Sequence, residues 1–245
     1  MQDEKLEQSG VNAVARTGLA ALQLDLDPSV SVTDRVHRLL RAAIIGVRLA
    51  PGTPISENSL SRQFSISRSP VRAAIQRLAE EGLVDVSPQR GSYVAALHLD
   101  ELHNSHFVRR SLELALLRET APCWTPEMTT RMRGVLTDQE TALRDCDADR
   151  FLVLDETFHR TLAELSGRAG VWTAIHTAYT ALVRFHYYWA QLDRLADVVQ
   201  EHIAIVDALE RGDGQAAEAA LAGHLDMVFV ILDRMPEDRR KELPF

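Results

Sequence analysis

Four side chains in the carboxyl-terminal half have the types and spacing of metal ligands. Asp155 and His159 are four residues apart, so on a helix they converge on one point. Both fall on the apolar stripe of their segment, where a carboxylate and an imidazole need partners. Mutual pairing is one solution, and a bound metal is another. His202 and His224 lie among apolar positions of two later segments.

Together these four side chains offer three nitrogens and one carboxylate, a set that suits zinc, nickel, manganese or iron. Taken singly, each histidine also fits a hydrogen-bonded core residue. The residues alone therefore leave both interpretations open.

A second set of residues, which begins at Ser67, has chemistry suited to nucleic acid. Ser67 can cap a helix, Pro70 is tolerated in its first turn, and apolar residues then recur at helical spacing. Arg68 and Arg72 lie one turn apart at the helix start, where the helix dipole disfavours cations. With Ser69 beside them, they suit contact with phosphates and guanine edges, although two arginines alone fit a solvated charged face equally well.

The neighbouring segments predict a winged helix-turn-helix. Residues 56–64 form a short helix, and a two-residue turn leads from it into the arginine helix. Residues 83–86 and 92–95 have strand character, and the turn between them carries Arg90 and Gly91. This hairpin is the wing, whose tip suits a minor groove or the DNA backbone. Upstream, residues 32–46 form a helix that ends at a Pro/Gly turn.

The charge of the chain is divided unevenly. Residues 29–97 hold nine arginines and five acids, a balance of +4, while the whole chain carries −8. The remainder therefore carries −12. A basic module joined to an acidic one is expected when only one end binds nucleic acid.

Residues 29–97 resemble the DNA-binding domain of the GntR family of bacterial transcription regulators. The spaced elements that carry the resemblance are Arg41, Pro51-Gly52, Glu57-x-x-Leu60-Ser61, Ser67-Arg68-Ser69-Pro70-Val71-Arg72, Leu78-x-x-Glu81-Gly82-Leu83-Val84 and Arg90-Gly91.

The resemblance implies roles for these residues. Arg68 and Arg72 would contact bases or phosphates, Ser69 and Arg41 the DNA backbone, and Arg90 with Gly91 would form the wing tip. The predicted DNA-binding set is completed by Ser67, Pro70 and Asn58. Asn58 stands where several members have a DNA-contacting arginine, so the operator sequence does not follow from the family. Ser61 replaces the usual alanine, a change expected to matter little.

Beyond residue 97 strand signals end and helical periodicity continues. Breaks separate six predicted helices, at 99–121, 126–145, 149–166, 169–191, 195–211 and 214–234. Short connections favour antiparallel neighbours. The predicted fold is mainly α: a flexible arm (1–28), an N-terminal winged helix-turn-helix (29–97), an all-α antiparallel six-helix bundle (98–235) and a frayed tail (236–245).

The bundle resembles the FCD domain of one large GntR subfamily. There the metal ligands are an Asp-x-x-x-His pair on one helix and one histidine on each of two later helices. Asp155, His159, His202 and His224 match this order. The resemblance implies a divalent metal ion, with zinc as the first choice and nickel, manganese or iron as alternatives.

The segment Phe107–Glu113 extends this resemblance. Its Arg-x-x-Leu-Glu pattern places Arg109, with Glu113, at the effector pocket of the family. A guanidinium can clamp a carboxylate with two hydrogen bonds, so the implied effector is a small organic acid. The alternative for Arg109 is a salt bridge to Glu113 on the same helix face.

The predicted function is a homodimeric, ligand-responsive transcription regulator, expected to act as a repressor at a pseudo-palindromic operator, and not an enzyme. The alternatives are a metal-dependent enzyme with an appended DNA-binding module and a purely metal-responsive regulator. No apolar run approaches the roughly eighteen residues that span a bilayer, and no secretory signal is evident. Cys123 and Cys146 match no metal or redox spacing. We therefore expect a cytoplasmic protein with reduced thiols and no membrane partner.

Overall fold

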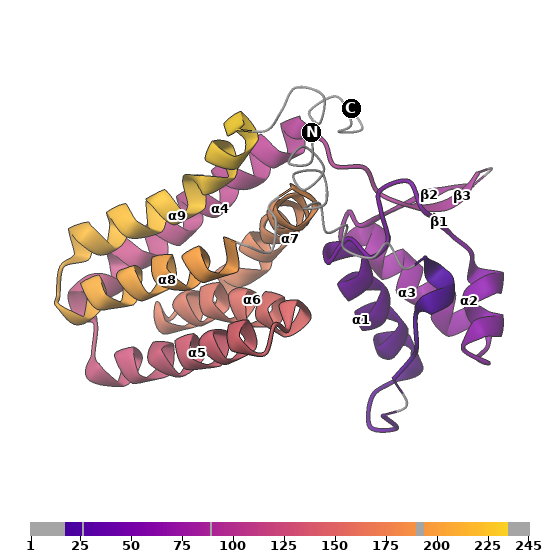
Figure 1. Cartoon of the computed structure of the whole chain (residues 1–245), viewed down its shortest axis with the longest axis horizontal. Coiled ribbons are helices and arrows are strands. Elements are labelled where there is room, and N and C mark those ends of the chain that lie inside the picture. The colour runs from indigo at the N-terminus through magenta and orange to yellow at the C-terminus, as the bar shows by residue number, and fades with distance from the viewer. Residues whose placement is uncertain (1–17, 26, 89, 190–193, 235–245) are drawn as a thin grey trace, which may run out of the picture. The chain divides into compact units, whose positions relative to one another are not determined.

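The computed structural model describes residues 18–25, 27–88, 90–189 and 194–234. Contacts divide the chain into two units, the first of which ends at Ala96 while the second begins at Leu97 (Figure 1). Helices and a small sheet form the first unit, and helices form the second.

In the part of the first unit that the structure describes, the α-helices are α1 (Val32–Ile45), α2 (Glu57–Gln63) and α3 (Arg68–Glu80). Helix α1 packs against α3, and α2 packs against α3. Apolar residues on the facing sides are fully buried, namely Val36, Leu40, Ile44, Leu60, Val71, Ala74, Ile75 and Leu78. The packing of these stripes fixes the helix-turn-helix that the periodicity predicted.

A three-stranded antiparallel sheet completes the first unit. Its strands are β1 (Pro54–Ile55), β2 (Val84–Ser87) and β3 (Gly91–Val94), in the order β1-β3-β2. The hairpin of β2 and β3 is the predicted wing. Strand β1 was not predicted, because two residues carry no periodic signal and Pro54 favoured a turn. Proline is tolerated there since it opens an edge strand.

The segment predicted to be a flexible arm contains a short helix in the part that the structure describes. Residues Leu19–Ala21 form the short 3₁₀ helix η1, and Leu22 is buried. The side-chain amide of Gln63 on α2 donates to the carbonyl oxygens of Leu19 and Leu22, at 3.0 and 2.6 Å. The burial of Leu22 and these hydrogen bonds fix residues 19–22, although the composition of the segment predicted a flexible arm. Residues 1–17, like the tail 236–245, lie outside the described residues.

Six α-helices form the second unit over residues 97–189 and 194–234, which the structure describes. They are α4 (Leu99–Thr120), α5 (Pro126–Arg144), α6 (Ala148–Leu165), α7 (Trp172–Trp189), α8 (Leu195–Glu210) and α9 (Gly214–Arg234). Figure 1 shows α5 beside α6 and α8 beside α9, pairs that also pack through their side chains. The main core joins α4, α5, α6, α8 and α9 through residues that include Leu117, Met132, Leu136, Phe158, Leu162, Ile205, Leu209 and Leu221. The six predicted helices are thus all present, with short connections.

Helix α9 qualifies one expectation from the sequence. By length and composition it could cross a membrane, with a mean hydropathy of 1.3, although no segment was expected to do so. It packs against α8 and α4, and Ala217, Leu221, Leu225 and Val228 on it are buried. Its apolar character therefore serves the core of the bundle.

Candidate metal centre and nucleic-acid interface

Helix α3 begins and ends near the predicted residues, but with one difference. Ser67 is the N-cap residue, yet its side chain makes no capping hydrogen bond, so the predicted capping role of its hydroxyl is wrong. At the other end Gly82 has φ +71°. The amides of Gly82 and Leu83 donate to the carbonyls of Ala79 and Leu78, a Schellman motif.

The turn between α2 and α3 is held by Ser61, a residue expected to matter little. The Ser61 hydroxyl donates to the carbonyl oxygen of Ile66 at 2.6 Å. Ser65 adopts a left-handed conformation with φ +54° in the same turn. An alanine at position 61 could not make this bond, so Ser61 has a structural role that the expectation missed.

The predicted DNA-contacting residues of the helix-turn-helix gather on an exposed surface. Asn58 on α2 and Arg68, Ser69 and Arg72 at the start of α3 are exposed, and Pro70 is half-buried. Arg72 makes a two-pronged ion pair with Glu57, the first residue of α2, at 2.9–3.1 Å. At the wing, Arg90 is exposed and Gly91 has φ +95°, which favours glycine.

Arg41 lies in a different setting from the other predicted contacts. Its Nε donates to Glu81 Oε2 at 3.2 Å, and His37 Nε2 lies 2.6 Å from Glu81 Oε1. His37 is buried, and this carboxylate gives its imidazole a partner. The three side chains tie α1 to the carboxyl end of α3.

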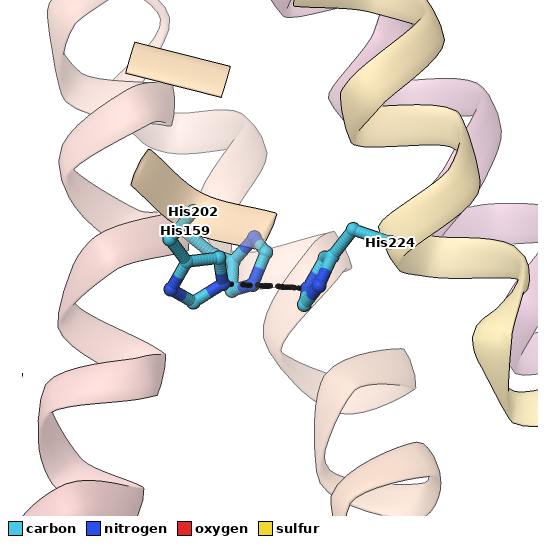
Figure 2. A group of neighbouring side chains, drawn as sticks. All are labelled: His159, His202 and His224. Carbon is cyan, nitrogen blue, oxygen red and sulfur yellow. Dashed lines mark hydrogen bonds between the residues drawn. The ribbon is translucent and has the colours of Figure 1, made fainter. Parts of the chain in front are cut away.

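In the second unit the histidines of three helices meet at one point (Figure 2). His224 Nε2 on α9 lies 3.3 Å from His159 Nε2 on α6 and 3.4 Å from His202 Nε2 on α8. All three side chains are buried. Among the described residues, these histidines offer ligand atoms that all lie within 4.8 Å of one another.

The opposite ring nitrogen of each histidine has an oxygen partner. His159 Nδ1 lies 2.7 Å from a Glu113 carboxylate oxygen, and His224 Nδ1 lies 2.8 Å from one of Glu201. His202 Nδ1 lies 3.0 Å from the side-chain oxygen of Gln139. Such oxygens accept hydrogen bonds, so each Nδ1 carries the proton.

These partners leave the three Nε2 atoms as acceptors that lie close together, and that of His159 also accepts from Arg109 Nη2. Burial lowers the pKa of His159, and burial together with His224 lowers the pKa of His202 well below its usual value. Neutral imidazoles with Nδ1–H bonded to an acceptor are the form in which histidine binds metals. Nε2 lone pairs that converge favour a positive charge at that point, and the Arg109 guanidinium provides one at His159.

Asp155 lies beside this cluster and can serve as a fourth ligand. One carboxylate oxygen is 3.7 Å from His202 Nε2, and the other accepts a 2.7 Å hydrogen bond from the Tyr179 hydroxyl. It does not bond to His159, so the simple pairing considered from the sequence is not what the structure has. Three imidazoles and one carboxylate fit a divalent metal with positions open for another ligand.

Arg109 and Glu113 adjoin the same cluster. Arg109 Nε donates to Glu113 Oε1 at 2.6 Å, which is the salt bridge considered as the alternative. Arg109 Nη2 also donates to His159 Nε2 at 2.7 Å, and its guanidinium lies over the ring of Tyr179. Burial alone would raise the pKa of Glu113, but His159 and Arg109 outweigh it and lower that pKa to about 2.

Two residues at this centre were not predicted. Gln139 on α5 contacts His202 and Glu201 on α8 contacts His224, and no spacing in the sequence links either residue to the histidine that it contacts. The one available signal was polarity: Gln139 is fully buried on an otherwise apolar helix face.

Three further histidines, His103, His106 and His176, have partners outside this metal-ligand cluster. His106 bonds to Asp226 at 2.8 Å and packs against Phe229, on which His103 stacks. His176 lies 3.2 Å from Glu156. None of the three belongs to the cluster of His159, His202 and His224.

Comparisons with known proteins match both the DNA-binding unit and the helical bundle. Residues 32–94 match the bacterial regulatory proteins of the gntR family, and residues 105–227 match the FCD domain. The HTH-type transcriptional repressor RspR of Escherichia coli is 32% identical over 210 residues, which cover 84% of this chain and 91% of RspR. An HTH-type transcriptional regulator of Streptomyces ambofaciens is 34% identical over 201 residues, covering 82% of this chain and 84% of that protein.

A solved structure agrees as well. A chain from Rhodococcus sp. RHA1 described as a GntR transcriptional regulator superimposes with a TM-score of 0.73 at 25% identity, covering 84% of this chain and all of that one. The protein therefore belongs to the GntR family of bacterial transcription regulators, in the group that carries an FCD domain. It is a DNA-binding regulator and not an enzyme.

Proposed function

We propose that this protein is a cytoplasmic repressor that binds a pseudo-palindromic operator as a homodimer and responds to a small organic acid at a metal-containing site. Residues 29–97 are the DNA-binding domain, and residues 98–235 bind metal and effector and carry the dimer contacts. Support for repression comes from the relative RspR, which is named a repressor. Two-fold symmetry of a dimer would match the symmetry of such an operator.

The observation that carries the sensing half is the convergence of three buried Nε2 atoms beside Asp155. The metal is proposed to be held by Asp155, His159, His202 and His224, with zinc as the first choice. A divalent ion there supplies open coordination positions for oxygen ligands. Each ligating histidine is oriented by its Nδ1 bond, and such bonds to outer partners commonly raise metal affinity.

Arg109 is the proposed partner of the effector carboxylate. It is buried beside the cluster, where Glu113 engages its Nε and His159 its Nη2, while Nη1 is left by both contacts. An acid that reaches the cluster could use the remaining N–H groups. Arg109 and Glu113 lie on α4, the first helix after Leu97, so a shift of α4 is the proposed route to the DNA-binding domain. The effector acts as a switch only if it binds one arrangement more tightly than the other.

Native mass spectrometry with elemental analysis of the purified protein tests the site and the oligomer together. We expect a dimer with about one divalent metal ion per chain, released when the protein is unfolded by acid. A metal-free monomer that binds no added zinc would contradict the proposal.

Gel shifts on an operator selected from random duplexes test the response. With the metal present, we expect at least one acid from a panel of hydroxy acids, sugar acids and dicarboxylates to weaken operator binding. No change with any acid in the panel would count against effector control.

The second candidate is a purely metal-responsive regulator. It is favoured by one observation, the engagement of Arg109 by both Glu113 and His159. In that case chelation alone would abolish or restore operator binding, and no acid would be needed. Gel shifts with and without chelator, in the absence of any acid, separate the two candidates.

A further inference from the structure

Glu57 and Arg72 form an ion pair with two prongs inside the helix-turn-helix. Arg72 Nε lies 3.1 Å from both Glu57 carboxylate oxygens, and Arg72 Nη2 lies 2.9 Å from Oε2. Glu57 is the first residue of α2, and Arg72 lies in the second turn of α3. The pair therefore bridges the two helices on the surface predicted to face DNA.

This pair adds little to the stability of the fold. The Arg72 side chain is 61% exposed, and exposed ion pairs are screened by water. The geometry of the contact is therefore more informative than its energy.

The guanidinium of arginine has two forks of parallel N–H bonds. Nε and Nη2 form the side fork, and Nη1 and Nη2 form the end fork. Glu57 takes the side fork, whereas none of the described residues bonds to Nη1 of Arg72. The end fork has the spacing that matches O6 and N7 of guanine in the major groove.

The carboxylate itself is held in place. Glu57 lies in the first turn of α2, where the helix dipole favours a negative charge. The N-cap Ser56 accepts from the Ser59 amide, and Leu60 is fully buried, so the start of α2 is fixed. Arg68, one turn earlier on α3, is exposed and has no such partner among the described residues.

We propose that Glu57 is a positioning residue for base recognition: it holds Arg72 so that its end fork reads one guanine in each operator half-site. Arg68 lacks this support and contacts phosphate. The inference rests on the proposed function, because it requires α3 to enter the major groove. Without Glu57 the long Arg72 side chain is free to exchange between phosphates and bases, and guanine loses its advantage.

The test uses the full-length chain and duplex DNA. The wild-type protein selects a consensus from a randomised duplex library. Fluorescence anisotropy then gives the Kd for the consensus, for duplexes with each G·C pair replaced in turn, and for a mixed-sequence duplex. The variants are Glu57→Gln, Arg72→Ala and the double variant. Glu80→Gln is the matched control, since it removes an exposed acid from α3 and changes the charge equally.

We expect Glu57→Gln to weaken consensus binding about tenfold, the range of one lost bidentate base contact. Its affinity for the mixed duplex should equal that of Glu80→Gln, so the ratio of specific to non-specific binding falls. The loss should map to one G·C pair per half-site, and Glu57→Gln should have no further effect once Arg72 is alanine. An unchanged thermal unfolding temperature of Glu57→Gln would show that the fold is intact. If the role of Glu57 were purely structural, that temperature would fall.

Two results would overturn the inference. If Glu57→Gln binds the consensus as tightly as Glu80→Gln, with every base preference retained, Glu57 does not position Arg72. If it binds more tightly, Glu57 is a competitor of DNA for Arg72. A wild-type chain that enriches no sequence would instead overturn the proposed function, and this inference with it.

Discussion

At the scale of single residues, the metal centre depends on which nitrogen of each histidine carries the proton. Glu113, Gln139 and Glu201 each accept from an Nδ1–H, which leaves the Nε2 atoms as ligands. Two of these partners are carboxylates and one is a neutral amide. His202 is thus the ligand whose outer partner carries no charge.

A substitution at His202 can separate ligation from folding. In His202→Asn the side-chain amide can still donate to Gln139, but the Nε2 ligand is gone. We expect the metal content to fall while the bundle stays folded, as measured by elemental analysis and far-UV circular dichroism. The control is His98→Ala, which removes an exposed histidine at the start of α4. Equal metal content in both variants would refute the ligand assignment.

Arg109 illustrates the cost of an unpaired buried charge. The Arg109 and Glu113 side chains are 8% and 4% exposed. We expect Arg109→Ala to lower the free energy of unfolding of the chelator-treated protein by about 3–5 kcal/mol, because Glu113 loses its cation inside the bundle. Urea denaturation followed by tryptophan fluorescence measures this, since all three tryptophans lie beyond residue 97.

The control for that experiment is Arg118→Ala on the same helix. Arg118 pairs with Glu218 at 2.6 Å, but its side chain is 58% exposed and water can replace the partner. We expect little change in stability. If both variants unfolded at the same urea concentration, burial would not be the cause.

At the scale of elements, the DNA-binding unit is held together by a contact between α1 and the carboxyl end of α3. Glu81 at the end of α3 accepts from His37 and Arg41 of α1. Burial alone would raise the pKa of Glu81, but His37 and Arg41 outweigh it and lower that pKa. The ionised carboxylate of Glu81 therefore stabilises the folded state more than the protonated carboxyl group does.

This shift predicts how pH affects the unit. A folded pKa below the unfolded value of about 4.5 gives stability that is present above pH 4.5 and lost as the pH falls through the folded pKa. Glu81→Gln should therefore destabilise the unit by about 1 kcal/mol at pH 7 and by progressively less as the pH falls below about 4.5. Hydrogen exchange of peptides from residues 29–97 measures it, and a pH-independent difference would contradict the assignment.

At the scale of the whole molecule, the charge balance separates a basic reader from an acidic bundle. Residues 29–97 carry +4 within a chain of −8. Phosphate contacts by the arginines release counterions, so salt should weaken DNA binding steeply. The acidic remainder makes non-specific binding by the bundle unfavourable.

A substitution of Arg90 at the wing tip tests this salt dependence. Arg90→Ala should weaken binding to all sequences alike and reduce the slope of log K against log salt by about 1, because one phosphate contact is lost. The measurement is anisotropy over a salt series with consensus and mixed duplexes. A loss confined to the consensus would instead mean that Arg90 reads bases.

The sequence by itself determined the helices, the helix-turn-helix, the wing and the four candidate ligands, because each depends on spacing within one segment. Periodicity alone places Asp155, His159, His202 and His224 on the inward faces of their helices. It missed β1, whose two residues carry no pattern, and η1, which depends on bonds from Gln63 44 residues away.

Only the tertiary structure decided what those residues contact. Gln139 meets His202 across 63 residues, and Glu57 meets Arg72 across 15. Both pairs form because helices pack and bring side chains to within hydrogen-bond distance, which no local spacing encodes. Hydrophobic periodicity follows from the sequence of one helix, whereas these hydrogen-bond partners depend on how two helices pack.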